Sequence, residues 1–551
     1  MIPFSKKTNY YSSLLSLVVL IIMLTPKTIC TQESNESYHK RMQWWDEGRL
    51  GMFLHWGVYS TFGGEYNGMD YGKEIGQSSA EWIYLASNMP QTAYQNAALN
   101  WNPNKYNPEE WVKMAKDAGM TYMVLTSKHH DGYALFNTET TDWNSVETSA
   151  INRDLIKDFV LACNKYDMKV GFYYSHEKDW INHVRQNVDL NPISEKYKNF
   201  VKQQITELFT NYGKIDLIWF DMPVQKHREF NKMCADLVRK LQPECIINGR
   251  IGSGLGDYKN IGDRAIVNPG MAGYMESIMT MRLNWGYDKN DDYWKSSDEL
   301  IKMVSKSACR GSNFLLNIGP TPEGTFPLQD QVRLDNLGKW MKLNAEAIYK
   351  TKGSPFSKEH KWGSLSQSKK NNIIYLHLWN WSGGNITVNG LLSNVESASF
   401  LDTHKNLTFT QHKNSSELIV ELPKINSSEN LRIVKLVVDK KTFDITKGPD
   451  FVAPKVKHKE HLKLTGTIHK INGINFTITG RLVTRDKIGK EIYKDEITTQ
   501  FTLNDQVRFR INTDGDIREV QSLNLNEGSK YHIVYSSDKN NPEVKIVTEL
   551  K

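Results

Sequence analysis

The hydrophobic pattern of the chain indicates alternating strands and helices over residues 44–350. Short apolar runs in this region alternate with segments whose apolar residues recur at helical spacing. A helix is predicted over 108–119, because Asn107 occupies the N-cap position, Pro108 the first turn and Gly119 the C-terminal cap. Repeated strand–helix units are typical of a parallel sheet with helical crossovers.

Polar residues at the ends of the predicted strands favour a closed barrel over an open doubly wound sheet. We expect strands over 52–56, 122–126, 170–174, 215–220, 246–248 and 314–318, and helices over 108–119, 153–166, 197–209, 230–241, 297–308 and 328–349. The polar residues near strand ends are His55, His129, His130, Tyr173, Asp221 and Arg250. A barrel gathers its chemistry at the carboxyl ends of its strands. Residues 31–350 are therefore expected to form an α/β domain, a (β/α)8-like TIM barrel.

After residue 350 the pattern changes to period-two alternation, which predicts β-structure. Alternating segments separated by glycine turns occur at 372–379, 385–388, 417–422 and 431–437. We expect a β-sandwich over 355–440 and a lysine- and proline-containing linker over 440–459. An additional all-β C-terminal module is expected over 461–551, acting as a spacer or as a polysaccharide-binding module.

Residues 1–30 have the pattern of a secretory signal peptide. Lys6 and Lys7 precede an apolar run over 14–24, and polar residues follow Cys30. The apolar run is too short to cross a bilayer, which takes about 20 residues. We expect no membrane span and a secreted or periplasmic location, with Cys30 as a candidate site for a lipid anchor.

Composition narrows the classes of function without selecting one. The chain has 551 residues, of which 24% are charged, and a formal net charge of +7. This charge is too small and too scattered to predict nucleic-acid binding. Five cysteines without a CxxC pair indicate neither a disulfide framework nor a zinc site, and Cys163, Cys234 and Cys245 are expected to be buried free thiols. The 15 Trp and 25 Tyr residues suit sugar stacking and core packing equally well.

Two carboxylates of the barrel region are candidates for acid–base chemistry. Asp221 follows an apolar strand that ends in Trp219 and Phe220, where a charge is costly unless it is used or paired. The alternative is that Asp221 caps a following helix. Glu276 lies among apolar and aromatic residues, and this setting would raise its pKa and keep it protonated near neutrality.

The histidines allow two interpretations. His55, His129 and His130 could bind zinc, or they could form hydrogen bonds with sugar hydroxyls. No HExxH motif is present. The glycine cluster after Arg250 does not match GxGxxG in register, so a nucleotide site is not expected.

Several segments of residues 44–221, taken together, resemble the α-L-fucosidases of glycoside hydrolase family 29. The resemblance runs in order across about 300 residues, through 44–45 (WW), 55–60 (HWGVYS), 118–130, 152–155 (NRDL), 171–175 (GFYYS) and 218–221 (IWFD). It covers the barrel and is expected to extend into the sandwich, but it does not reach the C-terminal module.

The resemblance implies a retaining exo-α-L-fucosidase that acts on fucosylated oligosaccharides or polysaccharides and needs no cofactor or metal. It places Asp221 at the nucleophile position and Glu276 at the acid/base position, although Met275 stands where the family commonly has Trp. The positions that match the sugar pocket are His55, Glu81, Trp82, His129, His130, Tyr173, Arg250 and Trp285. If Glu276 is not the acid/base, the candidates are Glu177, Asp179 and Glu65.

These roles agree with the chemistry of retaining glycosidases, which use two carboxyls about 5–5.5 Å apart. One carboxylate attacks the anomeric carbon, and the other protonates the leaving oxygen and then activates water. The alternatives are a non-catalytic fucose-binding protein on the same barrel, a retaining glycosidase for a related sugar such as L-galactose, and a metal hydrolase.

Overall fold

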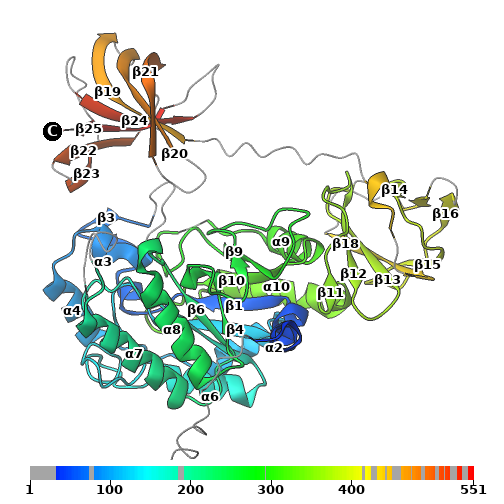
Figure 1. The fold of residues 1–551 in the computed structure, drawn as a ribbon, viewed down its shortest axis with the longest axis horizontal. Coiled ribbons are helices and arrows are strands. Elements are labelled where there is room, and N and C mark those ends of the chain that lie inside the picture. Colours follow the sequence, from blue (N-terminus) through cyan, green and yellow to red (C-terminus); the bar gives the residue numbers. More distant parts are fainter. Residues whose placement is uncertain are drawn as a thin grey trace, which may run out of the picture. The chain divides into compact units, whose positions relative to one another are not determined.

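The computed structural model describes residues 33–448 and the strands between residues 461 and 550. Within the first range it leaves out 73–79, 184–191, 292, 382, 413–415, 424–430 and 441–442. The chain divides into two compact units, Met1–Phe451 and Val452–Lys551 (Figure 1). The predicted signal peptide with Cys30 and most of the predicted linker lie outside the described residues.

Eight parallel strands form the central sheet of the first unit. In the order in which they pair, they are β7 (Ile246–Ile247), β6 (Leu217–Phe220), β5 (Lys169–Tyr174), β4 (Tyr122–Lys128), β1 (Leu50–Leu54), β10 (Asn313–Ile318), β9 (Met275–Thr280) and β8 (Lys259–Asn260). The backbone N–H of Asp257, just before β8, donates to the carbonyl of Ile247 at 2.7 Å and links the two end strands. The curled sheet confirms the predicted (β/α)8-like barrel.

Helices surround this sheet on its outer side. They are α5 (Pro108–Asp117), α6 (Leu155–Lys165), α7 (Glu195–Thr210), α8 (Arg228–Leu241), α9 (Ser297–Cys309) and α10 (Leu328–Asn344) (Figure 1). The predicted cap of α5 is confirmed, because the Asn107 side chain accepts from the backbone N–H of Glu110. Between β7 and β9 the chain contains the short 3-10 helix η5 (Gly249–Ile251) and no α-helix, so the barrel is irregular there.

Alternation along β6 determines which side chains face the barrel interior. Leu217 and Trp219 belong to the cluster of buried residues inside the barrel. Ile218 and Phe220 belong to the larger core between the sheet and the helices. Since successive residues of a strand point to opposite faces, Asp221 continues the inward-facing series.

The structure contains elements near the N-terminus and around Glu276 that the hydrophobic pattern did not predict. They are α2 (Asn35–Gly48), η1 (Val58–Phe62), the hairpin β2–β3 (Glu65–Tyr66 and Met69–Asp70), η2 (Ala80–Trp82), α3 (Ile83–Ala86), α4 (Gln91–Asn100) and β9. Met42 and Trp45 of α2 are fully buried and join the interior cluster of the barrel. Helix α2 therefore packs against the amino ends of the strands.

Two antiparallel sheets follow the barrel within the first unit. One contains β11 (Thr351–Lys352), β12 (Gly363–Ser368), β13 (Ile373–Leu378), β18 (Arg432–Val438) and β15 (Val395–Phe400); the other contains β14 (Ile386–Asn389), β17 (Glu417–Val420) and β16 (Phe409–His412). Leu376 of the first sheet and Leu418 of the second are buried in one shared core, as in a β-sandwich.

The second unit is all β, as predicted. The seven strands that the structure describes there pair in the order β21 (Glu491–Thr502), β20 (Asn475–Arg485), β19 (His461–Asn472), β24 (Lys530–Ser536), β25 (Val544–Leu550), β22 (Arg508–Thr513) and β23 (Asp516–Val520). The predicted domain boundaries themselves stay predictions.

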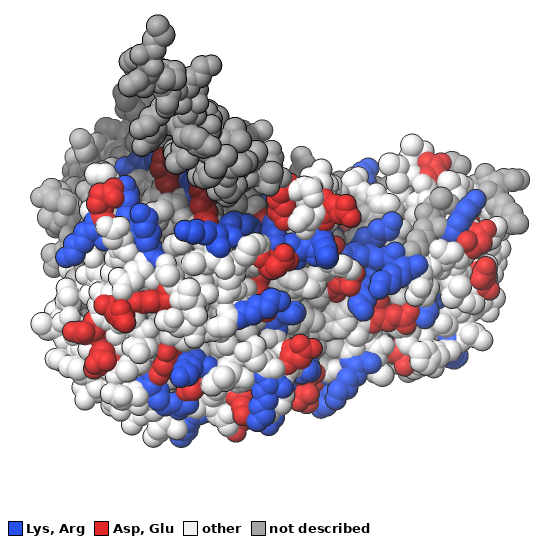
Figure 2. Space-filling model, turned by 60° about the horizontal axis from the view of Figure 1, so that its bottom comes forward, with Lys and Arg blue, Asp and Glu red and all other residues white. Residues whose placement is uncertain are grey.

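Surface charge and thiols agree with the composition. Figure 2 shows basic and acidic side chains interspersed on the face in view. Cys163, Cys234 and Cys245 are buried free thiols, as predicted, and so is Cys309. In the described part of the chain, no helix is both long enough and apolar enough to cross a membrane.

Candidate active site

A cavity opens at the carboxyl ends of the barrel strands. Eight of the ten site residues that the sequence predicts line this cavity, and Asp221 is one of them. The full lining is Phe53, His55, Glu81, Trp82, His129, His130, Trp219, Asp221, Met222, Arg250, Asp263 and Trp285. Tyr173 lies directly behind this lining, and Glu276 does not reach it. The barrel thus brings together residues that are up to 230 positions apart, from His55 to Trp285.

Asp221 is held as a carboxylate by two partners. The hydroxyl of Tyr173 donates to its Oδ2 at 2.8 Å, and Nη2 of Arg250 lies 2.5 Å from its Oδ1. Burial raises the pKa of Asp221, but Arg250 and the Tyr173 hydrogen bond outweigh burial, and the pKa lies below its ordinary value of 3.8. Asp221 is not a helix cap, because α8 begins only at Arg228.

His55 has a fixed tautomer because of its neighbour Asn317. The amide nitrogen of Asn317 donates to the carbonyl of Trp285 at 2.7 Å, so its amide oxygen faces His55 Nδ1, 2.6 Å away. Nδ1 therefore carries the proton. Burial lowers the pKa of His55 to about 4, which leaves a neutral ring whose Nε2 is an acceptor.

His129 and His130 are neutral for the same physical reason. Burial lowers the pKa of each well below its ordinary value of 6.5. The ring of His129 stacks on Tyr173 with centroids 5.3 Å apart, and its buried Nδ1 has no partner among the described residues. His130 Nδ1 lies 2.6 Å from the Ser175 hydroxyl, and its Nε2 lies 3.7 Å from Asp221 Oδ2. His130 thus lies beside the carboxylate, and His129 has hydrogen-bonding capacity that no described residue fills.

Glu81, Trp82 and Trp285 form further walls of the cavity. Glu81 is 3% exposed and accepts from the backbone N–H of Gly286 at 3.1 Å, and burial raises its pKa to about 7. The ring of Trp82 meets His130 edge-on at 5.1 Å, and the ring of Trp285 lies 5.2 Å from His55. Both indoles give the cavity apolar surface beside its polar groups.

Glu276 lies inside the barrel, away from the cavity. It is fully buried, and its carboxylate accepts hydrogen bonds from Tyr122, Trp219 and Asn260 at 2.9–3.0 Å. It pairs in register with Asn313 at the start of β10, near the amino ends of the strands. Burial raises its pKa to about 7, as its surroundings in the sequence suggested. This position argues against an acid/base role, because Trp219 lies between Glu276 and the cavity.

The alternative acid/base candidates also lie away from the cavity lining. Glu177 is buried and accepts from the Val224 backbone N–H at 2.7 Å and pairs with His227 Nδ1 at 2.6 Å. Asp179 is buried in an ion pair with Lys128 at 2.9 Å. Glu65 pairs with Lys289 at 3.2 Å. None of the three carboxylates belongs to the cavity lining.

Asp263 is the carboxylate that sequence reasoning missed. It lies in the loop between β8 and β9, and Nη1 of Arg250 binds it while Nη2 binds Asp221. Its side chain is 54% exposed. No strand ends at Asp263, so no hydrophobic pattern marks it. Trp219, by contrast, was identifiable, because it lies two residues before Asp221 on the same face of β6.

Among the described residues, no group of three or more His, Cys, Asp or Glu side chains is arranged to hold a metal ion.

A larger cavity, of about 470 Å³, lies elsewhere, and among its described lining residues Asp46 is the single acidic side chain. It therefore lacks the pair of carboxylates that glycoside hydrolysis uses.

Comparison with known protein families and with known sequences finds alpha-L-fucosidases in both cases. The family model described as "Alpha-L-fucosidase" matches residues 23–346. The plasma alpha-L-fucosidase of Rattus norvegicus is 28% identical over 418 residues, which cover 70% of this chain and 87% of the relative.

Solved structures agree with the sequence relatives. A glycoside hydrolase family 29 alpha-L-fucosidase from Bacteroides thetaiotaomicron is 28% identical, with a TM-score of 0.65 and coverage of 73% of this chain and 96% of that one. The alpha-L-fucosidase of Vibrio sp. strain EJY3 shares the fold at 24% identity, with a TM-score of 0.69 and coverage of 92% and 97%. Since the family match spans more than half of the chain, this protein belongs to the alpha-L-fucosidase family, glycoside hydrolase family 29.

Proposed function

We propose that this protein is a retaining exo-α-L-fucosidase that releases terminal α-L-fucosyl residues from oligosaccharides or polysaccharides. The observation that carries the proposal is Asp221, an ionised carboxylate held by Tyr173 and Arg250 in a cavity lined by imidazole and indole rings. The Bacteroides thetaiotaomicron relative supports it, since that structure is described as a trapped covalent intermediate in complex with 2-fluoro-fucosyl fluoride.

The proposed reaction has two displacements at the anomeric carbon. In the first, Asp221 forms a bond to C1, the bond from C1 to the leaving oxygen breaks, and the general acid transfers its proton to that oxygen. In the second, water attacks C1, its proton goes to the same residue acting as base, and the bond to Asp221 breaks. Arg250 and Tyr173 stabilise the carboxylate as it leaves. Two inversions retain the α configuration.

We assign the acid/base role to Asp263 in place of Glu276. One guanidinium, that of Arg250, bridges Asp263 and Asp221, so the cavity holds two neighbouring carboxyls, as the mechanism of retaining enzymes requires. The half-exposed side chain of Asp263 is open to solvent, so it takes up a proton from water before it transfers one to the leaving oxygen. Glu81 is enclosed and held by Gly286, which suits contact with the sugar.

Recognition of fucose is assigned to the neutral rings. His55, His129 and His130 would form hydrogen bonds with the hydroxyls, and these bonds can strengthen on the oxocarbenium-like transition state. Trp82 and Trp285 would contact the C6 methyl group. An apolar wall rejects an added hydroxyl only modestly, so L-galactosides are expected as poor substrates.

The proposal extends to location and to the accessory domains. The signal-peptide pattern of residues 1–30 supports export, and so do the names of relatives that are plasma alpha-L-fucosidases. We assign a packing role to the β-sandwich, because Trp340 of α10 donates to the Leu431 carbonyl at 3.2 Å across the junction. The 461–551 module is assigned as a spacer.

An activity assay with chemical rescue tests the proposal. Asp221→Gly is expected to abolish hydrolysis of a chromogenic fucoside, and added azide or formate is expected to restore part of it by occupying the vacated space. Full activity of Asp221→Gly would overturn the assignment. Wild-type protein that binds fucose without turnover would favour the non-catalytic alternative.

A further inference from the structure

A cavity of about 470 Å³ lies at the end of the barrel opposite to Asp221. Its lining includes Arg49, Tyr274 and Gly311, which lie just before β1, β9 and β10. Asp221 instead follows the last residue of β6, and all these strands are parallel. Helix α2 and the sandwich strands β11 and β12 complete the walls. Ligand pockets are commonly about 300–1,000 Å³, so this cavity accommodates a small ligand.

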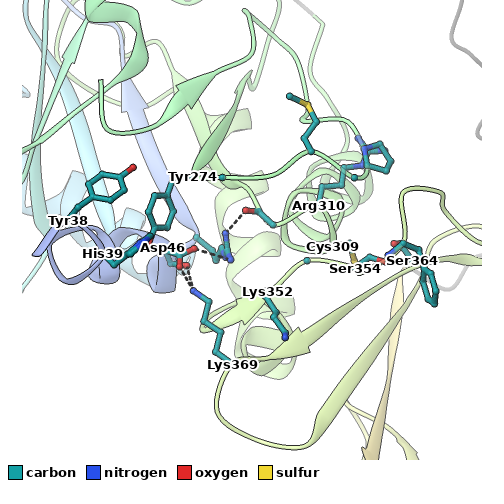
Figure 3. A pocket seen from close by; sticks show the side chains of 18 residues that line it. Tyr38, His39, Asp46, Tyr274, Cys309, Arg310, Lys352, Ser354, Ser364 and Lys369 are labelled. Atoms are coloured by element: carbon teal, nitrogen blue, oxygen red, sulfur yellow. Dashed lines mark hydrogen bonds and ion pairs between the residues drawn. The ribbon is translucent and has the colours of Figure 1, made fainter. Parts of the chain in front are cut away.

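One side of the cavity is aromatic (Figure 3). Tyr38 and His39 of α2 each lie 5.7 Å from Tyr274, and His39 Nδ1 pairs with the Tyr274 hydroxyl at 2.8 Å. The rings are inclined to Tyr274 by 65–66°, so they do not form the parallel slot in which a nucleobase would stack. Single ring faces with polar edges suit a sugar ring.

The other side of the cavity is basic. In the described lining, four basic side chains, Arg49, Arg310, Lys352 and Lys369, stand against the single carboxylate of Asp46. Arg49 and Lys369 share this one carboxylate. Figure 3 shows Lys369 pointing toward Asp46. Arg310 is neutralised by Glu359 at 2.6 Å, whereas Lys352 is exposed and has no ion pair with any described residue. The lining therefore carries excess positive charge.

Arg49 is the buried part of this charge. Its side chain is 3% exposed, and its terminal nitrogens donate to the carbonyls of Gly311 and Thr351 at 2.9 and 2.5 Å. Its Nε has no partner in the described part of the chain. The residue has φ of +55°, a left-handed conformation that costs free energy for a non-glycine residue. The negative charge that balances buried Arg49 is one carboxylate, which Lys369 shares. A further anion would therefore stabilise this buried cation.

We propose that this cavity is a second carbohydrate site, which binds a sugar unit that carries an anionic group, either a sulfate ester or a carboxylate. The ring lies against Tyr274, and the anionic group lies toward Arg49 and Lys352. Binding here does not depend on the catalytic proposal. If both proposals hold, an anionic glycan is retained at one end of the barrel while its fucosyl termini are cleaved at the other end. This consequence does rest on the catalytic proposal.

Calorimetric titration of the full chain tests this site separately from catalysis. The probes are a sulfated galactan tetrasaccharide, an oligogalacturonide of the same length, neutral galactotetraose and inorganic sulfate. None of them contains fucose, so none is a substrate. The variants are Lys352→Glu and Tyr274→Ala, with Lys157→Glu on α6 as the matched control, since Lys157 is exposed and lies in neither cavity lining.

Saturable binding of either anionic oligosaccharide is expected, and the stronger of the two identifies the anionic group. Lys352→Glu is expected to weaken it about tenfold, since it replaces an attraction by a repulsion. Tyr274→Ala should weaken it too, while Lys157→Glu leaves it unchanged and all three variants hydrolyse a chromogenic fucoside normally. Equal loss in Lys352→Glu and Lys157→Glu would overturn the proposal. So would equal binding of neutral galactotetraose, binding of inorganic sulfate as tight as that of the oligosaccharides, or no binding.

Discussion

The indole N–H of Trp219 donates to Glu276 across 3.0 Å, and the same indole lines the cavity that contains Asp221. The Trp219 ring also stacks on Tyr173, with centroids 5.7 Å apart, and Tyr173 donates to Asp221. Glu276 thus supports the wall of the cavity from inside the barrel. It does so without reaching the place where a sugar would react.

This arrangement predicts the kinetics of Glu276→Ala. The change leaves the donors of Tyr122, Trp219 and Asn260 without their acceptor, at a cost of about 1–3 kcal/mol for each donor that stays unpaired. Since the Trp219 wall shifts for every substrate, kcat/KM is expected to fall by the same factor on natural fucosides and on aryl fucosides with good leaving groups. Measuring both substrate classes checks this. Activity that is spared on the aryl fucosides alone would return the acid/base role to Glu276.

The buried Glu276 carboxyl also predicts a pH dependence of stability. Its pKa is about 7 in the folded protein against an ordinary value of 4.5, so its stabilising contribution is complete below pH 4.5 and is lost as the pH rises through 7. This difference corresponds to about 3 kcal/mol. Glu276→Gln is expected to lose less stability between pH 5 and pH 8 than wild type in urea unfolding. Glu81 titrates in both proteins and cancels. Parallel stability curves would contradict the assignment.

A different substrate dependence is expected for Asp263→Ala. If Asp263 donates the proton to the leaving oxygen, its loss should lower kcat/KM on natural fucosides on the order of 10²–10⁴-fold. Aryl fucosides with good leaving groups need little protonation and should lose much less. Glu276→Ala serves as the comparison in the same assay. A uniform loss across leaving groups would exclude Asp263 as the acid.

Tyr173→Phe tests the electrostatic support of the nucleophile. The Tyr173 hydroxyl helps to lower the pKa of Asp221, so its removal should raise that pKa. The acidic limb of the kcat/KM profile would then move to higher pH, because Asp221 must be ionised to attack. The profile of a chromogenic fucoside from acidic to neutral pH shows the shift. An unmoved acidic limb would mean that Tyr173 does not tune Asp221.

The sequence predicted the part of the site that lies on regular strands. Asp221 directly follows β6 and His55 directly follows β1, so an apolar run marks each of them. Because parallel strands place their carboxyl ends at the same edge, the two residues could be expected to meet. Residue preferences at helix ends predicted the cap at Asn107, and period-two alternation predicted the strands of the sandwich.

The remainder depended on tertiary structure that the hydrophobic pattern does not carry. Glu276 lies near the start of β9, so its side chain faces the barrel interior rather than the catalytic end, and the strand itself was not predicted. Asp263 lies in a loop, and its ion pair with Arg250 at the cavity is a tertiary contact that no local pattern marks. Helix α2 was missed because its buried Met42 and Trp45 form too short an apolar stripe to distinguish it from a loop.

Covalent labelling tests the central claim most directly. The intact protein is incubated with 2-fluoro-fucosyl fluoride, digested with a protease and analysed by mass spectrometry. The account predicts one fluorofucosyl group per chain, attached to the Asp221 carboxylate and absent from Asp221→Gly. An active enzyme that forms no adduct, or an adduct on another residue, would contradict a retaining mechanism with Asp221 as its nucleophile.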